Sequence, residues 1–345
     1  MKTLKLAFVD FWPSFDPQAN VLMEILKRHF DVRLVDDPDF VVYSNFGYAH
    51  LDHDVPRVFY TSENLRPDFN ECDYALGCDR LTFGDRYFRF TNGLFDCQKE
   101  LREIGPRRYV PASRKFCNFV YSNGHADPTR DRFFRLLSEY KQVDSAGRHL
   151  NNTGFRIVDK VSFQRDYRFS IAFENSSTDG YSTEKIIHAY CAGTIPIYWG
   201  DPQIGLDFNP ESFVNCHDYP SLEKVVERVV ALDTDEAAYR KVYEAPFLRR
   251  PLNGYAFEPG FEEFVVRTFN QDPARAFRRN REFWGKAYEA QRRKFASYIT
   301  RIERDRLFSL REHLKIWGPV KTLRKYSEKA KERRTEQEER MLRDV

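Results

Sequence analysis

Residues 169–200 read FSIAFENSSTDGYSTEKIIHAYCAGTIPIYWG, and this stretch decides the fold class. Residues 169–173 form a short apolar run of the length expected for one buried strand. A polar loop follows, and Ser182 or Thr183 stands where a helix N-cap is expected. Residues 195–199 form a second apolar run after the helix. The pattern predicts a strand–helix–strand unit in a parallel α/β sheet.

The polar loop and the helix start carry the chemistry of this unit. Because parallel crossovers are right-handed, both lie at the carboxyl edge of the sheet, where open α/β sheets bind ligands. A helix start offers N–H groups and a positive dipole end, which suit phosphate. Lys185 follows Glu184 in the first turn, where dipole logic disfavours a lysine unless an anion pairs with it. We therefore expect a phosphate site here, and a solvent-exposed helix start is the alternative.

The composition is that of a folded chain of 345 residues, since 41% hydrophobic and 16% aromatic residues are enough for real cores. The formal net charge is +3, which is too small to argue for a nucleic-acid binder. Six cysteines without C-x-x-C spacing favour reduced thiols over disulfides or a zinc site. An acid follows too soon after the first residue for a signal peptide, and no apolar run could span a bilayer. We expect a cytoplasmic protein with two domains.

The first half alternates strands with a helix. Apolar runs at 4–9, 40–43 and 57–60 predict buried strands, and residues 20–30 predict an amphipathic helix. This order indicates a Rossmann-like domain, although it lacks a Gly-x-Gly-x-x-Gly loop. A nucleotide is therefore expected to bind in the second half. Glu63 lies in the loop that follows the 57–60 strand, so it is either a plain loop residue or a cleft residue facing the second domain.

The second half repeats this organisation and ends in a charged helical segment. Arg130 stands at the start of a helix predicted over 131–140, either as a second phosphate contact or as a surface arginine. From about Pro273 the chain becomes helical, and residues 319–345 hold nine Lys/Arg against six acids. A basic amphipathic tail favours contact with an anionic membrane surface. A helix packed on its own domain, or a solvated one, is the alternative.

Three motifs in the second half resemble the donor-site signature of one enzyme family. They are F-E-N at 173–175, Y-S-T-E-K at 181–185 and G-T-I-P-I-Y-W-G at 193–200. With this spacing they resemble the α1,3-fucosyltransferases, in the bacterial form that builds Lewis-type antigens of surface glycans. A looser resemblance includes V-F-Y-T-S-E-N at 58–64, and about residues 1–260 fit the family.

The resemblance implies a GT-B fold, in which two Rossmann-like domains face each other across a cleft. Its expected parts are an acceptor domain at 1–112, a GDP-fucose domain at 113–272, and a helical segment at 273–345 that partly packs back on the core and ends in the basic tail. The implied reaction is inverting transfer of L-fucose from GDP-fucose to the 3-hydroxyl of N-acetylglucosamine in lactosamine-type acceptors. The 4-hydroxyl is the alternative target.

The resemblance also assigns roles to six residues. Glu63 matches the family's general base, and the donor contacts carry over onto Arg130, Asn175, Tyr181, Glu184 and Lys185. Two fixed cations, Lys185 and Arg130, can replace a divalent metal beside a leaving diphosphate. No Asp-x-Asp stands in a convincing metal-binding loop. We expect no tightly bound metal, a stimulatory ion at most, and GDP-fucose as a substrate rather than a cofactor.

Two other functions stay open. Another GT-B glycosyltransferase would use a different nucleotide sugar, and a non-catalytic adaptor would bind membrane or RNA through the tail. A Glu-Lys pair at a helix start beside a polar loop argues against an adaptor. The acceptor is not readable, because residues 49–54 and 66–71 carry no interpretable pattern. The expected partners are GDP-fucose, an oligosaccharide acceptor and the anionic inner face of the cell membrane, without nucleic acid.

Overall fold

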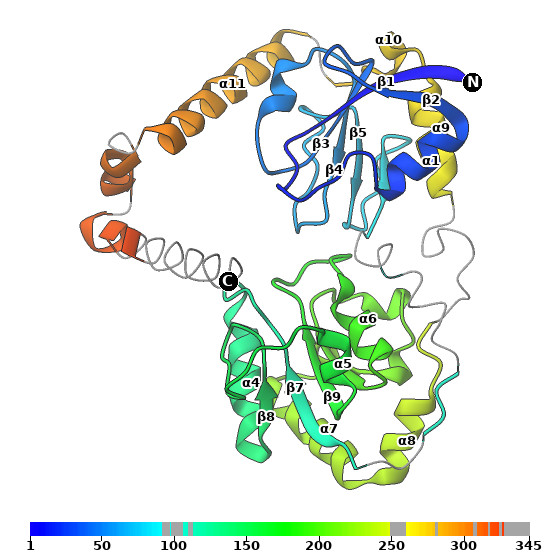
Figure 1. Cartoon of the computed structure of the whole chain (residues 1–345), viewed down its shortest axis with the longest axis vertical. Helices are drawn as coiled ribbons and strands as arrows, with labels where there is room; N and C mark the ends of the chain where they lie inside the picture. The colour runs from blue at the N-terminus through cyan, green and yellow to red at the C-terminus, as the bar shows by residue number, and fades with distance from the viewer. Residues whose placement is uncertain are drawn as a thin grey trace, which may run out of the picture. The chain divides into compact units, whose positions relative to one another are not determined.

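The protein is described by a computed structural model that covers residues 1–91, 97, 106–109, 113–248, 260–279, 282–305, 309–316, 318–323 and 326–327. The chain divides into two compact units, residues 1–279 and residues 280–345. The first unit contains two separate parallel sheets, each packed against helices (Figure 1). The expected α/β class with two Rossmann-like domains is confirmed.

The first sheet has the strand order β2-β1-β3-β4-β5-β6, and every pair is parallel. Its strands are β1 (Lys2–Val9), β2 (Phe30–Leu34), β3 (Phe40–Tyr43), β4 (Arg57–Tyr60), β5 (Tyr74–Gly77) and β6 (Tyr87–Arg89). The apolar runs predicted the central strands because parallel strands are buried on both faces. The edge strand β6 has only three residues, and the sequence pattern did not reveal it.

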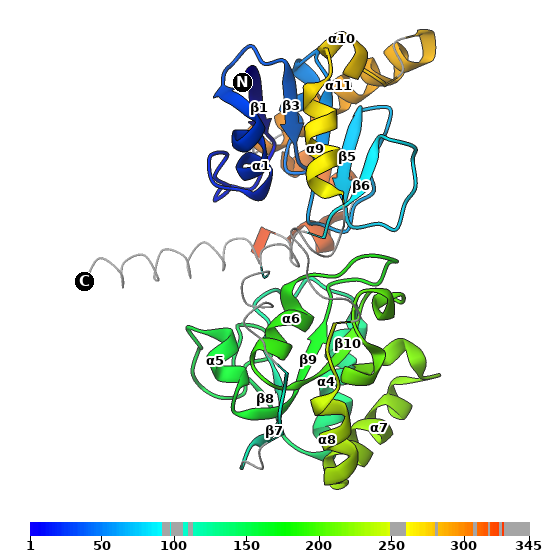
Figure 2. The same ribbon diagram turned by 90° about the vertical axis from the view of Figure 1, so that its right-hand side faces the viewer.

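Two helices from opposite ends of this unit cover one face of the first sheet. Helix α1 (Val21–His29) is capped by Asn20, whose side chain accepts from the Met23 N–H. Helix α9 (Phe261–Asn270) lies beside α1 in both views, followed by α10 (Pro273–Ala276) (Figures 1 and 2). The α9 side chains Phe264 and Phe269 are buried in the core that also holds α1.

The predicted boundary of the second domain at residue 272 is therefore wrong, because α9 belongs to the core of the first. The apolar face of α9 repeats at helical spacing and must be buried. The face of the six-stranded sheet beside α1 offers the apolar surface that buries it. The local sequence does not indicate which of the two sheets buries the apolar face of α9.

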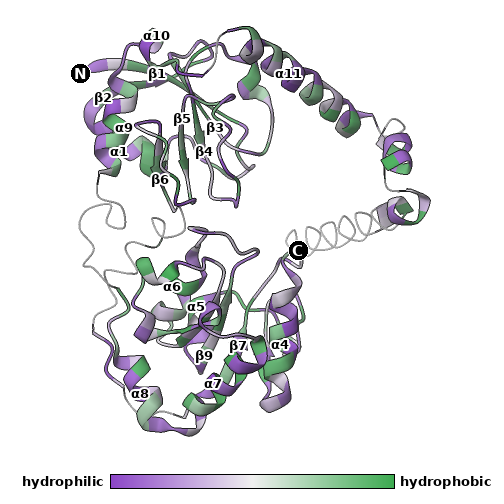
Figure 3. Ribbon diagram, turned by 180° about the vertical axis from the view of Figure 1, so that it is seen from behind, coloured by the Kyte–Doolittle hydropathy of each residue, from purple (hydrophilic) through white to green (hydrophobic). Residues whose placement is uncertain are grey.

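The second sheet has the order β11-β10-β9-β7-β8, again with every pair parallel. Its strands are β7 (Lys115–Phe119), β8 (Val143–Ser145), β9 (Tyr167–Phe173), β10 (Ile195–Trp199) and β11 (Val214–Asn215). Helices α4 (Pro128–Tyr140), α7 (Leu222–Thr234) and α8 (Glu236–Glu244) pack on one face. Helix α6 (Glu184–Cys191) packs on the other, beside α5 (Lys160–Gln164). Figure 3 shows hydrophobic residues along the strands and hydrophilic residues on the helix surfaces.

The central strand–helix–strand unit forms as predicted, as β9, α6 and β10. Thr183 is the N-cap residue of α6, and Gly193 adopts a left-handed φ of 65° after its end. Residues Pro210–Ser212, before β11, form a 3₁₀ turn, because Pro210 presets the helical φ and the Asn209 side chain accepts from the Glu211 N–H.

The second unit is helical where it is described. Its main element is α11 (Phe283–Arg304), on which hydrophilic and hydrophobic residues alternate along the length (Figure 3). None of the helices in the described part of the chain is both long and apolar enough to cross a bilayer. Residues 324–325 and 328–345 of the predicted tail lie outside the described residues. Contact of this tail with an anionic membrane stays a prediction.

The position of α9 predicts that a substitution on this helix destabilises the core of the first sheet. Phe269 is 1% exposed, and its ring lies 5.2 Å from the Phe40 ring of β3. Phe269→Ala should lower the free energy of unfolding by about 3–5 kcal/mol, measured in urea, because it leaves a cavity in the first core. Phe283→Ala on α11, where the ring is 74% exposed, is the control and should change it by under about 0.5 kcal/mol. Equal effects would contradict this placement of α9.

Candidate active site

A pocket of about 550 Å³ opens at the carboxyl edge of the second sheet. Its lining comes from residues 120–123 after β7, residues 146–148 after β8, residues 156–158 with Lys160, and the start of α6. Four predicted site residues line it together: Arg130, Asn175, Glu184 and Lys185. Parallel strands bring these distant segments to one edge, which is why the site forms there.

The lining carries five cationic side chains and one carboxylate. Besides Arg130 and Lys185, the cations are Arg148, Arg156 and Lys160, which the sequence reasoning missed. The available signal was a set of basic residues in an otherwise polar run between β8 and α5. This excess of cationic over anionic side chains favours an anionic ligand that is small enough to enter the pocket.

The fully buried Glu174 organises the start of α6. One carboxylate oxygen accepts from the Thr183 N–H at 2.8 Å. The other accepts from the Thr183 hydroxyl at 2.7 Å and from the Lys185 ammonium at 2.9 Å. The Thr183 N–H is therefore already paired and is not one of the N–H groups that the helix start offers to a phosphate. Lys185 likewise has a protein partner already, which explains a lysine at this end of the helix.

Charge coupling sets the protonation of the pocket residues. Burial by itself would raise the pKa of Glu184, but the ammonium groups of Lys185 and Lys160 lower it to about 2. Burial opposes the charge on Lys185, yet the carboxylates of Glu174 and Glu184 outweigh it and raise the lysine pKa. Burial lowers the pKa of Lys160, although Glu184 works in the opposite direction. Near neutral pH the site therefore holds an ionised Glu184 beside a firmly charged Lys185.

Arg130 enters the pocket from α4 with its side chain buried. The guanidinium stacks 4.3 Å from the centre of the Tyr121 ring and donates to the Asn123 carbonyl at 2.6 Å. A longer bond of 3.4 Å reaches the Asn175 side-chain oxygen. Among the described residues, the Arg130 Nε–H makes no hydrogen bond, and an Asp131 carboxylate oxygen lies 3.8 Å from the Nε atom. A buried donor without a hydrogen bond at a pocket wall favours an anionic ligand there.

Glu63 and Tyr181 do not line this pocket. Glu63 is exposed in the loop after β4, and the neighbouring Asn64 amide donates to the hydroxyls of Ser176 at 2.7 Å and Thr178 at 2.8 Å. Tyr181 is buried, and burial raises its pKa together with the nearby charges of Glu174 and Glu63. The loop of Glu63 thus contacts the loop that follows Asn175, and the roles of Glu63 and Tyr181 stay predictions.

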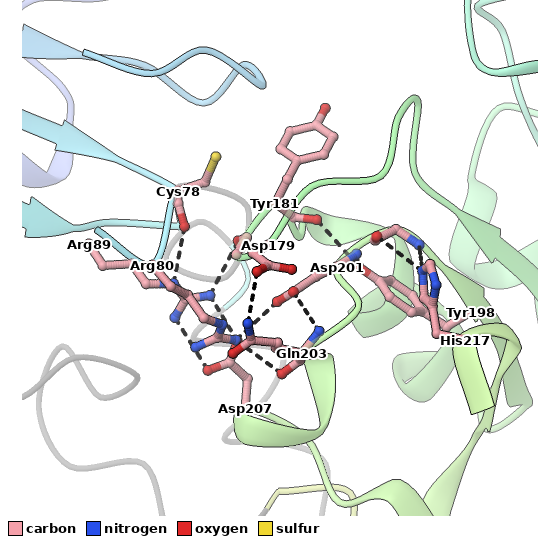
Figure 4. Close-up of polar contacts among 12 residues, drawn as sticks. Cys78, Arg80, Arg89, Asp179, Tyr181, Tyr198, Asp201, Gln203, Asp207 and His217 are labelled. Carbon is pink, nitrogen blue, oxygen red and sulfur yellow. Dashed lines mark hydrogen bonds and ion pairs between the residues drawn. The ribbon is translucent and has the colours of Figure 1, made fainter. Parts of the chain in front are cut away.

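An ion-pair cluster joins the two sheet domains beside this loop contact. Arg80 bonds Asp201 at 3.0 Å and Asp207 at 2.7 Å, and Arg89 bonds Asp207 at 2.8 Å. Figure 4 shows both arginines pointing toward Asp207, with the Tyr181 ring directed away from the ion pairs. Gly180 has a φ of 91°, and a Cβ on it would lie 2.2 Å from the Cys78 carbonyl oxygen. The close approach of the two domains at this point requires a glycine.

No group of three or more His, Cys, Asp or Glu side chains that could hold a metal ion occurs in the described part of the chain. The cationic side chains of the pocket suit a diphosphate without a metal ion, because Lys and Arg donate charge-assisted hydrogen bonds to phosphate oxygens. The expectation of no tightly bound metal stays a prediction.

The buried ion pair predicts a large effect of Glu174→Gln. The amide keeps the shape and the hydrogen bond to Thr183 but leaves the Lys185 ammonium, whose side chain is 12% exposed, without its closest counter-ion. Urea denaturation should show a loss of about 3–5 kcal/mol of unfolding free energy. Glu223→Gln removes an exposed partner of Arg132 with a similar bond length of 2.8 Å and should change little. Similar stabilities for the two variants would contradict the organising role of Glu174.

Comparison with known proteins matches both sheet domains. Residues 6–95 match the model of the alpha-(1,3)-fucosyltransferase FucT N-terminal domain, and residues 110–245 match the model of the glycosyltransferase family 10 (fucosyltransferase) C-terminal domain.

Individual relatives agree with these two models. The alpha-(1,3)-fucosyltransferase FucT of Helicobacter pylori is 34% identical over an alignment of 299 residues, and the match covers 74% of this chain and 62% of that protein. A 3-galactosyl-N-acetylglucosaminide 4-alpha-L-fucosyltransferase of Bos taurus is 30% identical over 145 residues, 41% of this chain and 39% of the relative. This chain thus spans less than two thirds of either relative.

A solved structure supports the fold at the level of coordinates. The crystal structure of an alpha1,3-fucosyltransferase with GDP-fucose superposes with a TM-score of 0.67 at 29% identity, covering 82% of this chain and 93% of that one. The two family models lie one after the other and cover both sheets, as the sequence motifs predicted. The chain therefore belongs to the α1,3-fucosyltransferase family, the fucosyltransferases of glycosyltransferase family 10.

Proposed function

We propose that this protein is an inverting, GDP-fucose-dependent fucosyltransferase that acts on the 3-hydroxyl of N-acetylglucosamine in lactosamine-type acceptors. The observation that carries the proposal is the pocket that Arg130, Lys160 and Lys185 line together with Asn175 and Glu184. The fucosyltransferase crystallised with GDP-fucose supports the choice of donor. The names of the Helicobacter pylori and Bos taurus relatives support the two candidate hydroxyls, 3 and 4.

The cations of the pocket serve the departure of the nucleoside diphosphate. As the bond between fucose C1 and the β-phosphate oxygen breaks, negative charge grows on the diphosphate. Arg130 has a guanidinium fixed by its bonds to Asn123 and Asn175, and Lys185 is held in place by Glu174, so both meet this charge without reorganising. Glu184, ionised beside Lys185, suits hydroxyl groups of the ribose or fucose.

Glu63 serves the incoming hydroxyl. In an inverting displacement the acceptor oxygen bonds to fucose C1 on the face opposite the leaving diphosphate and gives up its proton to a base. The exposed Glu63 carboxylate stands in a loop that bonds the donor-side loop through Asn64, Ser176 and Thr178. A base so placed typically contributes ~10²–10⁴-fold of rate. This position supports Glu63 as the base of the proposed reaction.

A pair of variants tests the proposed division of labour. Lys185→Ala should abolish GDP binding in calorimetry, because the pocket loses the cation that Glu174 orients toward it. Glu63→Gln should retain GDP binding and lose ~10²-fold or more in turnover with GDP-fucose and N-acetyllactosamine.

The exposed Glu211→Gln serves as the control and should change neither measurement. GDP-mannose and UDP-sugars, compared with GDP-fucose in thermal shift, test the rival donors, because a true donor stabilises the fold in proportion to its occupancy. Full turnover by Glu63→Gln would remove this residue from the mechanism, and equal stabilisation by a UDP-sugar would refute the donor.

The pH dependence of GDP binding tests Lys160. Burial lowers the pKa of Lys160, whereas the carboxylates around Lys185 raise that of Lys185, so Lys160 loses its proton first as the pH rises. A cation with a lowered pKa loses its attraction for phosphate at a lower pH than an ordinary lysine. GDP affinity should therefore fall roughly tenfold on the alkaline side, the worth of one charge-assisted hydrogen bond.

Lys160→Arg keeps the charge throughout this range and should remove the early fall in affinity. Any titration of the nucleotide itself is common to both proteins and cancels in the comparison. Identical pH profiles, measured by calorimetry, would show that Lys160 does not contact the diphosphate.

A further inference from the structure

A cluster of aromatic side chains stands at the carboxyl edge of the first sheet, and none of its residues lines the pocket of the second sheet. Phe11, Trp12 and Phe15 follow β1, and Phe46 follows the adjacent strand β3. Phe11 and Phe15 stack at 3.9 Å and pack on the first core. The centre of the Trp12 ring lies 5.1 Å from that of the Phe15 ring and 6.0 Å from that of the Phe46 ring.

Trp12 and Phe46 form the outer part of this cluster, and we call these two residues the aromatic platform. Neither belongs to the hydrophobic clusters formed by the described residues, and Phe46 is 50% exposed. Their rings meet edge to face at 76°. Large aromatic side chains held together at a surface mark a binding site more often than isolated ones do.

The backbone under the platform is fixed rather than loose. Asp10, directly after β1, has a φ of 61° and accepts from the N–H groups of Ala49 and His50 at 2.9 Å each. The Phe46 N–H donates to the Asp10 carbonyl at 2.9 Å. A Cβ on Gly47 would lie 2.4 Å from an Asp10 carboxylate oxygen, so the loop closes tightly on Asp10. A residue that the surrounding hydrogen bonds hold in the left-handed backbone conformation is typical of functional sites.

Hydrogen bonds connect the platform to the loop of the proposed base. Asn45, next to Phe46, accepts from the Thr61 hydroxyl at 2.6 Å. The same Thr61 oxygen accepts from the Glu63 N–H at 3.0 Å. The loops after β1, β3 and β4, which are neighbours in the sheet, therefore place the platform and Glu63 at one edge.

We propose that Trp12 and Phe46 bind a sugar ring of the acceptor, and this inference rests on the proposed function. The C–H face of a pyranose is apolar and slightly positive, so it complements the negative face of an aromatic ring. Burying its carbons on a ring stabilises the complex, while its hydroxyls stay at the polar rim. Glu63 follows along the same edge, next to the loop after Asn175. A neutral oligosaccharide on the platform accordingly presents a hydroxyl to the base.

Acceptor kinetics and direct binding test the platform on the full chain. Trp12→Ala and Phe46→Ala should each raise the KM for N-acetyllactosamine roughly tenfold, with GDP affinity and kcat at saturating acceptor close to unchanged. Trp12→Phe should retain most of the affinity, because it keeps an aromatic face. Phe83→Ala is the matched control. Phe83 is 41% exposed and stacks on Phe69 before β6, at the amino edge of the same sheet.

Saturation-transfer NMR with N-acetyllactosamine and no donor measures binding of the sugar to the platform independently of catalysis. The wild type and Phe83→Ala should show transfer to the sugar protons, and Trp12→Ala should show little. Absent sugar signals with the wild type, or equal signals with Trp12→Ala, would overturn the inference. Failure of the wild type to transfer fucose would refute the proposed function instead, while the NMR comparison would still decide for or against the platform.

Discussion

One buried carboxylate determines the geometry of the pocket at the carboxyl edge of the second sheet. Glu174 is fully buried at the end of β9 and receives three hydrogen bonds, two from Thr183 and one from Lys185. It therefore caps α6 and fixes the lysine that faces the pocket. Breaking such a pair leaves an uncompensated charge, so the interaction specifies one arrangement of the helix start more than it adds net stability. The low pKa of Glu184 depends on the same lysine.

Parallel sheet topology explains why two distinct sites form in this chain. Each sheet brings the loops after its strands to one edge, and these loops carry polar residues and partly exposed aromatic residues. In the second sheet the edge gathers cations around a pocket. In the first it gathers the aromatic platform and Glu63. The bonds from Asn64 to Ser176 and Thr178 bring the two edges into contact, and the Arg80 and Arg89 ion pairs hold the domains beside them.

Local sequence patterns predicted the strands and helices that are strongly apolar or clearly capped. The apolar runs of β1, β3, β4, β9 and β10 and the glycine after α6 are examples, because burial on both faces and a left-handed cap leave a direct signature. The edge strands β6 and β8 have three residues each and gave no such signal. The motifs at 173–175 and 181–185 located the pocket, since residues close in sequence flank a single strand–helix turn.

The sequence by itself determined the α/β class, the family and four of the pocket residues, because periodicity and contiguous motifs are local properties of a chain. Only the tertiary structure decided that α9 completes the first core, that Glu174 neutralises Lys185, and that Lys160 and Arg156 enter the pocket. It also decided that Phe46 stands beside Trp12. Most of these contacts join residues that are far apart in the sequence, and the local sequence is compatible with other arrangements. Packing between helices, strands and loops therefore selects them, and no local pattern can.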